Sequence, residues 1–384
     1  IQRAYTGNPK VRKFRLKLRV MLTQSVVAKA ARAVFWTTSR ISFSAMEGFH
    51  SKAKALTYDS TGEPEKVLKL QELDVGQPQE GQLLLQFLRA PINPSDVNTI
   101  QGKYPIKPQL PSIPGHEGVA EVVALGNKVS GFSVGDRVVP IQPGQGTWRT
   151  RGVFNAKHFW RVPRDLPLEA AATLCVNPTT ALAMLERFVP LSPGDVVVQN
   201  GATSAVGQAV IQLAKAKGLQ TVNIIRDRPN WAETEDWLKK LGADVVTTEE
   251  KLLESLKQNG GKGPLADCKL GLNCVGGSSA VAVAKALCEG GTMVTYGGMS
   301  MQPVNIPTSL LIFKDLNFRG FWLSGRFART QPNAQKELLA KVVQYIQEGH
   351  LQVRTKEIPL ERFQEALALT NTAYRDQKVL LSME

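Results

Sequence analysis

The chain has 384 residues, of which 43% are hydrophobic, and its formal net charge at pH 7 is +14. A chain of this length holds two or three domains, and this composition is typical of a globular protein, which excludes disordered and collagen-like chains. No run of 18 apolar residues occurs, so we expect no membrane span. The four cysteines have no CxxC spacing and are interpreted as reduced core residues, which argues against a disulfide-rich secreted protein.

The positive charge is concentrated at the N-terminus. Residues 1–46 contain ten Lys or Arg and no acid, whereas residues 47–384 hold the other 37 basic residues against 33 acidic ones. The basic character therefore belongs to a leader and not to a nucleic-acid-binding face. Arg, Ser, Thr and Ala without acids are typical of a mitochondrial transit peptide, and Met21 opens a shorter leader of the same kind. The alternative is a disordered basic tail.

The next stretch, from Ser51 to about Arg164, has the pattern of β-structure. Short runs alternate between apolar and polar residues and are separated by Gly and Pro. This pattern predicts a partly open, barrel-like sheet. The clearest runs lie at residues 52–58, 82–88, 118–125 and 135–140.

From about Ala181 strands alternate with helices, which predicts a doubly wound parallel sheet. Six strands are expected, at residues 195–199, 220–225, 244–247, 270–275, 292–296 and 316–323. Helices are expected up to residue 217 and at residues 231–241, 249–258, 279–288, 333–348 and 360–370. A last strand at residues 378–382 could return to the first domain.

A turn of small residues, Asn200 to Gly207, follows the first of these parallel strands and opens a helix. A helix N-terminus with free backbone N–H groups favours a phosphate. Gly201 and Gly207 fit the dinucleotide-binding pattern G-x-G-x-x-G, but Thr203 replaces its middle glycine. Small residues here can also serve helix–strand packing, so the turn alone leaves both interpretations open.

The end of the second parallel strand carries Arg226, Asp227 and Arg228. In enzymes that use NAD an acid near this position binds the ribose 2′-hydroxyl. Two guanidinium groups instead suit a 2′-phosphate, which arginine can bind with two hydrogen bonds. We therefore predict NADPH as the cofactor; a solvated turn of mixed charge is the alternative.

His116 and Glu117, in a Gly-His-Glu-Gly run, suggest a zinc site at first sight. Zinc needs converging thiolate, imidazole and carboxylate ligands. The upstream stretch at residues 91–96 contains no cysteine, and the chain has no four-cysteine cluster. We therefore predict no metal and interpret both residues as structural or as lining a cleft.

Two further stretches are candidates for the reaction site. Tyr104 lies in a loop between Gly102 and Pro105, where a tyrosine, protonated near neutral pH, can donate a proton. An ordinary aromatic residue in a turn is the alternative. Phe321 and Trp322 end the last parallel strand, where ligands of such sheets bind, so they line a substrate slot or else pack in the core.

The order of five motifs resembles that of the medium-chain dehydrogenase/reductase superfamily, and within it the zinc-free mitochondrial enoyl-thioester reductases. The resemblance runs from about Ser51 to the C-terminus. The motifs are Asn93-Pro94-Ser95-Asp96, Gly115-His116-Glu117-Gly118, Gly135-Asp136-Arg137-Val138, the turn Asn200 to Gly207, and Tyr296-Gly297-Gly298-Met299.

The resemblance implies an α/β fold with a GroES-like, mostly-β catalytic domain (residues 47–180 and 325–384) and a Rossmann domain for NADPH (residues 181–324). It implies a homodimer in the mitochondrial matrix that uses NADPH to reduce trans-2-enoyl thioesters, carried by CoA or acyl-carrier protein, in fatty-acid synthesis. Tyr104 would be the proton donor. The cofactor-binding residues would be Asn177, Thr203, Ser204, Ala205, Val206, Arg226, Asp227, Arg228, Tyr296, Gly297, Gly298, Met299, Phe321, Trp322, Leu323, Ser324 and Lys378.

Two other functions fit the same features. One is an NADPH-dependent quinone or alkenal reductase of the same superfamily, which does not need the Tyr104 loop. The other is a non-catalytic interaction protein that binds NADPH as a structural or sensing ligand.

Overall fold

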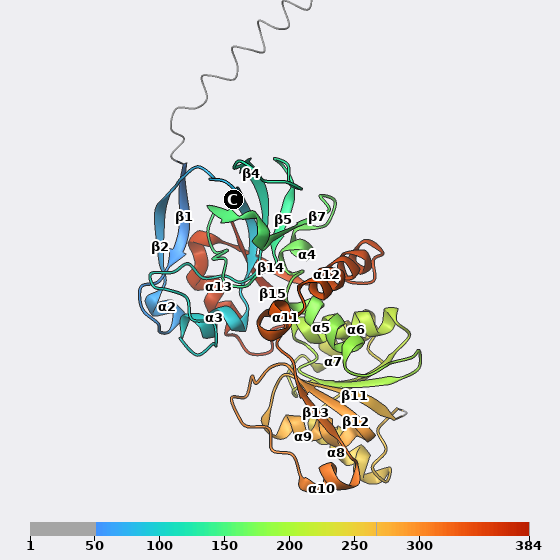
Figure 1. The fold of residues 1–384 in the computed structure, drawn as a ribbon. Helices are drawn as coiled ribbons and strands as arrows, with labels where there is room; N and C mark the ends of the chain where they lie inside the picture. The colour runs from blue at the N-terminus through green and yellow to red at the C-terminus, as the bar shows by residue number, and fades with distance from the viewer. Residues whose placement is uncertain (1–50, 266, 384) are drawn as a thin grey trace, which may run out of the picture. The chain divides into compact units, whose positions relative to one another are not determined.

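The computed structural model describes residues 51–265 and 267–383 (Figure 1). The basic leader predicted at residues 1–46 lies outside them. The described residues form one compact unit built around two large sheets. None of the helices in the described ranges has the length and apolar character needed to cross a membrane.

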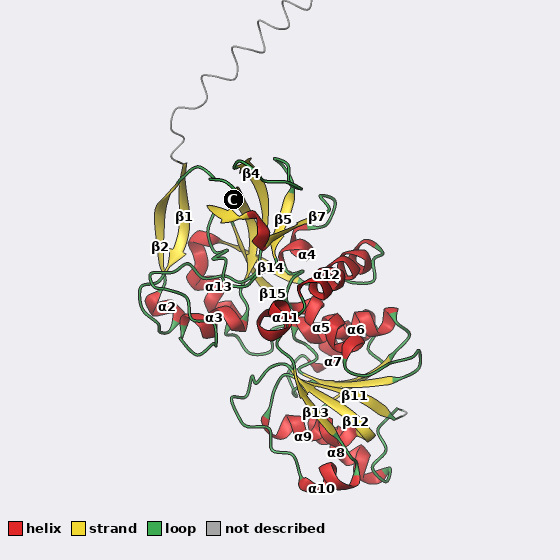
Figure 2. Cartoon of the chain, in the orientation of Figure 1, coloured by secondary structure: helices red, strands yellow, loops and turns green. Residues whose placement is uncertain are grey.

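The first large sheet has six parallel strands in the order β10-β9-β8-β11-β12-β13. Figure 2 shows three of them, β11, β12 and β13, side by side. After β8 the chain adds β9 and β10 on one side, and it then adds β11, β12 and β13 on the other side. The order of the strands therefore reverses between β8 and β11, which is the switch point of a doubly wound sheet. The strands are β8 (Val196–Asn200), β9 (Gln220–Ile224), β10 (Val245–Thr247), β11 (Cys268–Asn273), β12 (Leu287–Thr295) and β13 (Asn317–Gly320). The helices between them are α6 (Ala205–Ala216), α7 (Trp231–Leu241), α8 (Glu249–Gln258), α9 (Gly277–Ala286) and α10 (Thr308–Phe313).

The central strand β8 shows why this half folds as it does. All five of its residues are buried, as expected for a parallel strand covered by helices on both faces. The helix after it, α6, buries one apolar stripe that includes Val210 and Leu213, and it begins where the Ser204 hydroxyl accepts the backbone N–H of Gly207 at 3.1 Å. The predicted doubly wound sheet is therefore confirmed, with all six strands in place.

Two of its boundaries differ from the prediction by three residues or more, and the others by no more than two. Strand β12 begins at Leu287, five residues early, because its first residues continue directly from α9. The predicted strand at 316–323 is wrong at its end: β13 stops at Gly320, and Leu323–Phe327 form a π-helical turn, η2. Gly325 lets the chain fold against Trp322 there, since a Cβ at position 325 would lie 2.0 Å from Trp322 Cδ2.

The second large sheet has seven strands, of which six follow the order β14-β15-β3-β4-β5-β7, while β6 pairs with β3. All pairs are antiparallel except β14–β15. The strands are β3 (Gln82–Pro91), β4 (Val119–Leu125), β5 (Arg137–Pro140), β6 (Arg151–Asn155), β7 (Phe159–Val162), β14 (Thr355–Pro359) and β15 (Lys378–Ser382). A separate hairpin pairs β1 (Ser51–Thr57) with β2 (Lys69–Val75). This mostly-β first half agrees with the prediction.

Short helices and connecting helices complete this part. They are α2 (Pro64–Val67), α3 (Pro94–Ile100), α4 (Leu168–Ala172), α5 (Asn177–Arg187), α11 (Ala328–Thr330), α12 (Pro332–Gln347) and α13 (Phe363–Thr370), with 3-10 turns η1 (Ala156–His158) and η3 (Leu360–Arg362). One hydrophobic core joins residues of α5 and α12 to both large sheets. The predicted boundary at residues 180/181 falls inside α5, and the domain limits stay a prediction.

The chain's last strand does return to the first domain. β15 lies between β14 and β3, where Leu381 pairs with Ala90. The predicted strand at 378–382 is confirmed with both ends correct, whereas β14 was not predicted. This return matters for the site because it places Lys378 and the residues before it near the carboxyl ends of the parallel strands.

Candidate active site

A cavity of about 430 Å³ lies where the two large sheets approach one another. It is lined by residues from α3 and the Tyr104 loop, from α5, from the turn before α6, from the end of β12 and from the stretch before β15. All of the predicted site residues line it except Arg226, Asp227 and Arg228. The structure thus brings Tyr104, Asn177, residues 203–206, 296–299 and 321–324, and Lys378 together.

The turn from β8 into α6 forms one wall of this cavity. Gly201 has a φ of +60°, and a Cβ there would lie 2.6 Å from Cys274 Sγ. A Cβ at Gly207 would lie 2.6 Å from Ala202 Cα, so both glycines of the motif are required by close packing. Thr203 at the middle position contacts Arg228, with 3.3 Å between its Oγ1 and the arginine Nη2. The α6 N-terminus therefore faces the cavity with its first N–H groups, as a phosphate requires.

Arg226 and Arg228 lie just beyond that wall. Arg226 is exposed, whereas Arg228 is buried and its Nε has no hydrogen-bond partner in the part of the chain that the structure describes. Burial, and then the charge of Arg226, lowers the pKa of Arg228. Neither arginine makes an ion pair within residues 51–265 and 267–383. The nearby Asp376 opposes this shift only in part. A buried guanidinium without an ion-pair partner among the described residues fits an anionic group.

Two residues that line the cavity carry further buried polar atoms. Nδ2 of Asn177, at the start of α5, has no hydrogen-bond partner among the described residues, whereas the Tyr296 hydroxyl, after β12, lies near Ser204 and Cys274. Burial raises the pKa of Tyr296 well above its ordinary value, so this hydroxyl stays protonated. Since buried polar groups are nearly always hydrogen-bonded, the unpaired amide of Asn177 favours a polar ligand in this part of the cavity. Together with the arginine pair, it fits a dinucleotide lying across the turn.

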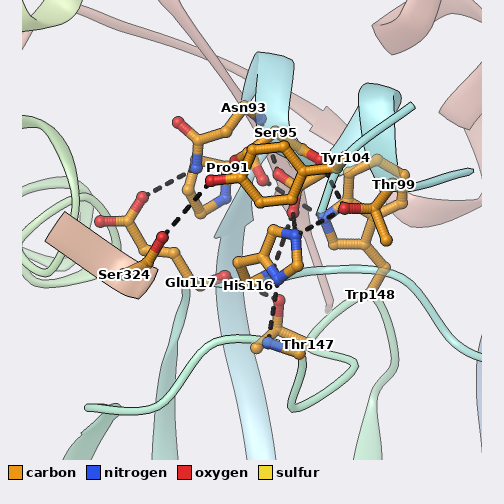
Figure 3. A network of polar contacts seen from close by, with 12 residues as sticks. Pro91, Asn93, Ser95, Thr99, Tyr104, His116, Glu117, Thr147, Trp148 and Ser324 are labelled. Carbon is orange, nitrogen blue, oxygen red and sulfur yellow. Dashed lines mark hydrogen bonds and ion pairs between the residues drawn. The ribbon is translucent and has the colours of Figure 1, made fainter. Parts of the chain in front are cut away.

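The Tyr104 loop places a phenol at the other end of the cavity. Helix α3 ends before Gly102, whose φ is +70°, and the N–H groups of Lys103 and Tyr104 both bond to the carbonyl of Asn98. Trp322 Nε1 donates to the Tyr104 hydroxyl oxygen at 2.6 Å, and the two rings meet edge to face. Ser324 Oγ lies 3.5 Å from the same oxygen (Figure 3). The tyrosine oxygen accepts from the indole, which leaves its own proton available.

Behind the Tyr104 loop lies a buried polar network (Figure 3). Glu117 accepts from Asn93 Nδ2 at 2.9 Å and from the backbone N–H of Val176 at 2.7 Å. Lys378 Nζ donates to Asn93 Oδ1 at 2.5 Å. Asp96 accepts the backbone N–H of Asn93 at 2.8 Å. The network therefore connects the loop before α3, the residue before α5 and the start of β15, three segments that line the cavity.

Three ionisable side chains of this network, Glu117, Lys378 and Asp96, are buried, and burial makes the charged form of each one costly. Burial raises the pKa of Glu117 to about 7, and Lys378 is the main group that opposes this shift. Burial lowers the pKa of Lys378 to about 8, opposed by the charges of Glu117 and Asp96. Burial also raises the pKa of Asp96, and the nearby His116 opposes it. Glu117 and Lys378 thus form a pair whose protonation changes near neutral pH.

His116 is held by hydrogen bonds at both ring nitrogens. Nδ1 accepts the backbone N–H of Gly144 at 2.9 Å, so the ring proton resides on Nε2, which lies 3.0 Å from Thr99 Oγ1. Thr99 in turn donates to the carbonyl of Ser95 at 2.7 Å. His116 lines the cavity and Glu117 is fully buried. Within the described ranges no cluster of three or more His, Cys, Asp and Glu side chains is placed to hold a metal.

The titration of Glu117 predicts a pH dependence of stability. Its folded-state pKa of about 7 exceeds the ordinary 4.5, so between these values the folded protein binds more protons than the unfolded chain. Its contribution to the free energy of unfolding therefore falls as pH rises through that window and is constant above it. In Glu117→Gln the fall between pH 4.5 and 7 should shrink by up to about 3 kcal/mol.

Urea unfolding of both proteins at pH 5 and pH 7 measures this. The comparison uses the difference between the two pH values, so that any fixed cost of the glutamine cancels. The Glu117 charge raises the pKa of Lys378, so the variant also changes the titration of Lys378; the same comparison in a Lys378→Met background removes that contribution. Equal pH differences in the two proteins would contradict a raised pKa at Glu117.

Comparison with known proteins identifies the family. Residues 79–179 match the family model of the alcohol dehydrogenase GroES-like domain, and residues 205–342 match that of the zinc-binding dehydrogenases. The mitochondrial enoyl-[acyl-carrier-protein] reductase of Homo sapiens is 46% identical over 334 residues, which cover 87% of this chain and 89% of the relative. That of Arabidopsis thaliana is also 46% identical, covering 82% and 84%. The chain belongs to the mitochondrial enoyl-[acyl-carrier-protein] reductase family.

Solved structures of this family agree with the fold. The complex of Etr1p with NADP and crotonyl-CoA is 34% identical, with a TM-score of 0.78, covering 86% of this chain and all of the other. The same values hold for the Etr1p/Etr2p heterodimer of Candida tropicalis, a mitochondrial 2-enoyl thioester reductase. The predicted family and the predicted combination of a GroES-like and a Rossmann domain are confirmed. The roles of the individual site residues stay predictions.

Some residues of the site were not predicted from the sequence. Asn93 lies in a motif that carried the resemblance, yet nothing in the sequence shows that it bridges Glu117 and Lys378. Tyr374 and Arg375 precede β15 in a polar turn with no recognisable pattern. This turn reaches the cavity because the strand after it, β15, pairs with β3. The predicted strand at residues 378–382 was therefore the only feature of the sequence that indicated where the turn lies.

Proposed function

We propose that this chain reduces the double bond of trans-2-enoyl thioesters with NADPH, giving saturated acyl thioesters. The observation that carries the proposal is a tyrosine hydroxyl, oriented by Trp322, in a cavity that also contains a phosphate-binding turn. A reductase of 34% identity has NADP and crotonyl-CoA bound in its structure. The family membership supports the same reaction.

The cofactor-binding residues form groups according to the part of the ligands that each one contacts. The turn at residues 203–206 and the α6 N-terminus bind the pyrophosphate, and Arg226 and Arg228 bind the 2′-phosphate. Asn177 Nδ2, which lacks a partner within the described residues, and the Tyr296 hydroxyl donate to the nicotinamide end or to the thioester. Residues 321–324 and 296–299 line the space between the nicotinamide end and the thioester. NADPH supplies the hydride that the β-carbon of the enoyl group receives.

Tyr104 supplies the proton. Hydride addition at the β-carbon places negative charge on the thioester oxygen and the α-carbon, where N–H and O–H donors stabilise it. The Tyr104 hydroxyl proton then passes to the α-carbon, directly or through a water molecule, which completes the addition of one hydride and one proton across the double bond. Because the tyrosine oxygen accepts from Trp322 Nε1, the phenolate that remains keeps a hydrogen bond.

Trp322 orients that phenol, so removing its N–H tests the arrangement. Trp322→Phe retains an aromatic ring but loses the hydrogen bond to Tyr104. We expect kcat to fall about tenfold, because the hydroxyl loses one donor and its fixed direction. The dissociation constant of NADPH, measured by its fluorescence, should change less than twofold. Trp160→Phe on β7, outside the cavity, is the matched control, and an unchanged kcat in Trp322→Phe would remove Trp322 from this role.

One assay tests the whole reaction. The oxidation of NADPH, compared with that of NADH, is measured with a series of trans-2-enoyl-CoA thioesters and with a simple quinone. Turnover with the thioesters and a preference for NADPH support the proposal. Turnover with the quinone alone favours a quinone reductase, and cofactor binding without any turnover favours an interaction protein.

We also infer the finer points of the assignment. The thioester carrier is acyl-carrier protein as well as CoA, as the relatives' name implies, and enzyme assays with both carriers compare them. The chain acts in the mitochondrial matrix, which fractionation of organelles tests. The catalytic domain comprises residues 47–180 and 325–384, and the Rossmann domain residues 181–324; limited proteolysis near these limits tests the partition.

A homodimer fits the exposed edge of the parallel sheet. β13 is the last strand of that sheet, and its outer side has no partner strand among the described residues. Ile312 and Phe313, at the end of α10 just before β13, are 66% and 78% exposed, and Met301 is 75% exposed. Two copies that pair β13 edges would cover such a surface. Sedimentation equilibrium tests this: a species of twice the chain's mass supports it, and a monomer contradicts it.

A further inference from the structure

The connection between α13 and β15 places a tyrosine against the arginine pair. We call residues 371–377 the α13–β15 connection. The ring centroid of Tyr374 lies 5.3 Å from Cζ of Arg226 and 5.2 Å from Cζ of Arg228. Both guanidinium groups are thus within cation–π distance of one ring. The ring belongs to a part of the chain about 150 residues beyond the motif that carries the arginines.

The connection is fixed at this place by several hydrogen bonds. Gln208 Nε2, on α6, donates to the carbonyl of Asp376 at 2.9 Å, and Arg228 Nη1 contacts the carbonyl of Tyr374 at 3.5 Å. The Asp376 carboxylate pairs with Arg354 at 2.5 Å. Tyr374 itself has a φ of +60°, a left-handed conformation that is costly for a tyrosine and persists where surrounding contacts determine it.

The choice of an aromatic residue suits a site that must bind a dianion. An acidic residue at this position would neutralise the guanidinium groups and compete with a phosphate. A ring face attracts and orders both groups but leaves their charge and their N–H donors available. Arg228 Nη2 lies 3.3 Å from Thr203 Oγ1, which places this guanidinium beside the phosphate-binding turn.

We propose that Tyr374 is a positioning residue that holds Arg226 and Arg228 for the 2′-phosphate of NADPH. The α13–β15 connection thereby contributes to the preference for NADPH over NADH. This inference rests on the proposed function, since it presumes that the anion is that of NADPH. Without the ring, the exposed Arg226 loses its fixed orientation and must be ordered when the phosphate binds, which weakens binding.

The test uses ligands that differ only by the 2′-phosphate, and its readout is binding rather than turnover. Titration calorimetry on the full chain measures the affinity of 2′,5′-ADP and of 5′-AMP. Tyr374→Asn removes the ring, and asparagine tolerates the left-handed backbone. We expect 2′,5′-ADP to bind about five- to tenfold more weakly to this variant, with the affinity for 5′-AMP changed less than twofold. Tyr374→Phe keeps the ring and should bind both ligands as the wild type does.

The possible results distinguish a positioning role of the Tyr374 ring from a general structural role. They also distinguish a failure of this inference from a failure of the proposed function. An unchanged affinity for 2′,5′-ADP in Tyr374→Asn overturns the inference, as does an equal loss for both ligands, which would mean a general structural role. Tyr374→Gly, which adopts the same φ without strain, repeats the test if the asparagine variant does not fold. A wild type that binds 2′,5′-ADP no better than 5′-AMP would contradict NADPH as the cofactor, whatever the variants do.

Discussion

Replacing Tyr104 with phenylalanine is expected to lower kcat for enoyl-thioester reduction by about 10²-fold or more, the usual contribution of a general acid. The variant keeps the ring that meets Trp322 edge to face and loses only the hydroxyl. Affinity for NADPH should be unchanged, because the phosphate-binding turn and the arginine pair lie elsewhere in the site. Steady-state oxidation of NADPH with crotonyl-CoA, together with fluorescence titration of NADPH, measures both quantities.

A second readout follows the proton itself. In D₂O the wild type should place deuterium on one face of the α-carbon, whereas in Tyr104→Phe protonation from bulk water should lose that facial preference. Tyr345→Phe, a half-buried tyrosine on α12 outside the cavity, is the matched control and should leave turnover intact. If Tyr104→Phe turned over at the wild-type rate with the same facial preference, another group would have to be the acid.

The parallel-sheet half could be predicted from sequence because its signals are local. Each strand is a short apolar run, most are followed by a helix, and the helices after β8 and β10 begin at the N-cap side chains of Ser204 and Thr248. Both faces of β8 are buried, so its residues need no alternation to be recognised as a strand. The six strands and their doubly wound, parallel arrangement were therefore predicted correctly, and the predicted end of the last strand failed where packing decided it, at Gly325 against Trp322.

The remaining parts of the site depend on contacts between distant segments. β14 is recognised as a strand only through its parallel pairing with β15, since its own residues are mostly exposed. Tyr374 meets Arg226 and Arg228 across roughly 150 residues of chain. No local pattern carries that information. Lys378 was predicted from the resemblance, but its bond to Asn93 required the register of β15 against β3.

The His116–Glu117 pair shows how one motif admits two interpretations. The sequence argument against zinc rested on the missing cysteine, and it left the role of both side chains open. In the structure, Glu117 accepts one hydrogen bond from the loop before α3 and one from Val176, directly before Asn177. Its carboxylate thus connects two segments that line the cavity. This role is structural, and it explains why a fully buried acid occupies that position.

Glu117→Ala is therefore expected to cost about 3–5 kcal/mol of the free energy of unfolding, the range found when one member of a buried ionic network is removed. The backbone N–H of Val176 and the amide of Asn93 both lose their acceptor in a place that water does not reach easily. Lys378 keeps Asp96 as its remaining counter-charge. Urea unfolding at pH 7, followed by circular dichroism, measures the loss.

Two further variants decide whether the loss belongs to this network. Glu121→Ala removes a carboxylate on β4 whose partner, Arg164, is 3.5 Å away and mostly exposed, so it should cost under about 1 kcal/mol. Glu117→Gln keeps the shape and one acceptor, and should fall between the wild type and Glu117→Ala. A loss in Glu117→Ala no larger than in Glu121→Ala would mean that Val176 and Asn93 find other acceptors, and that Glu117 does not connect the two segments.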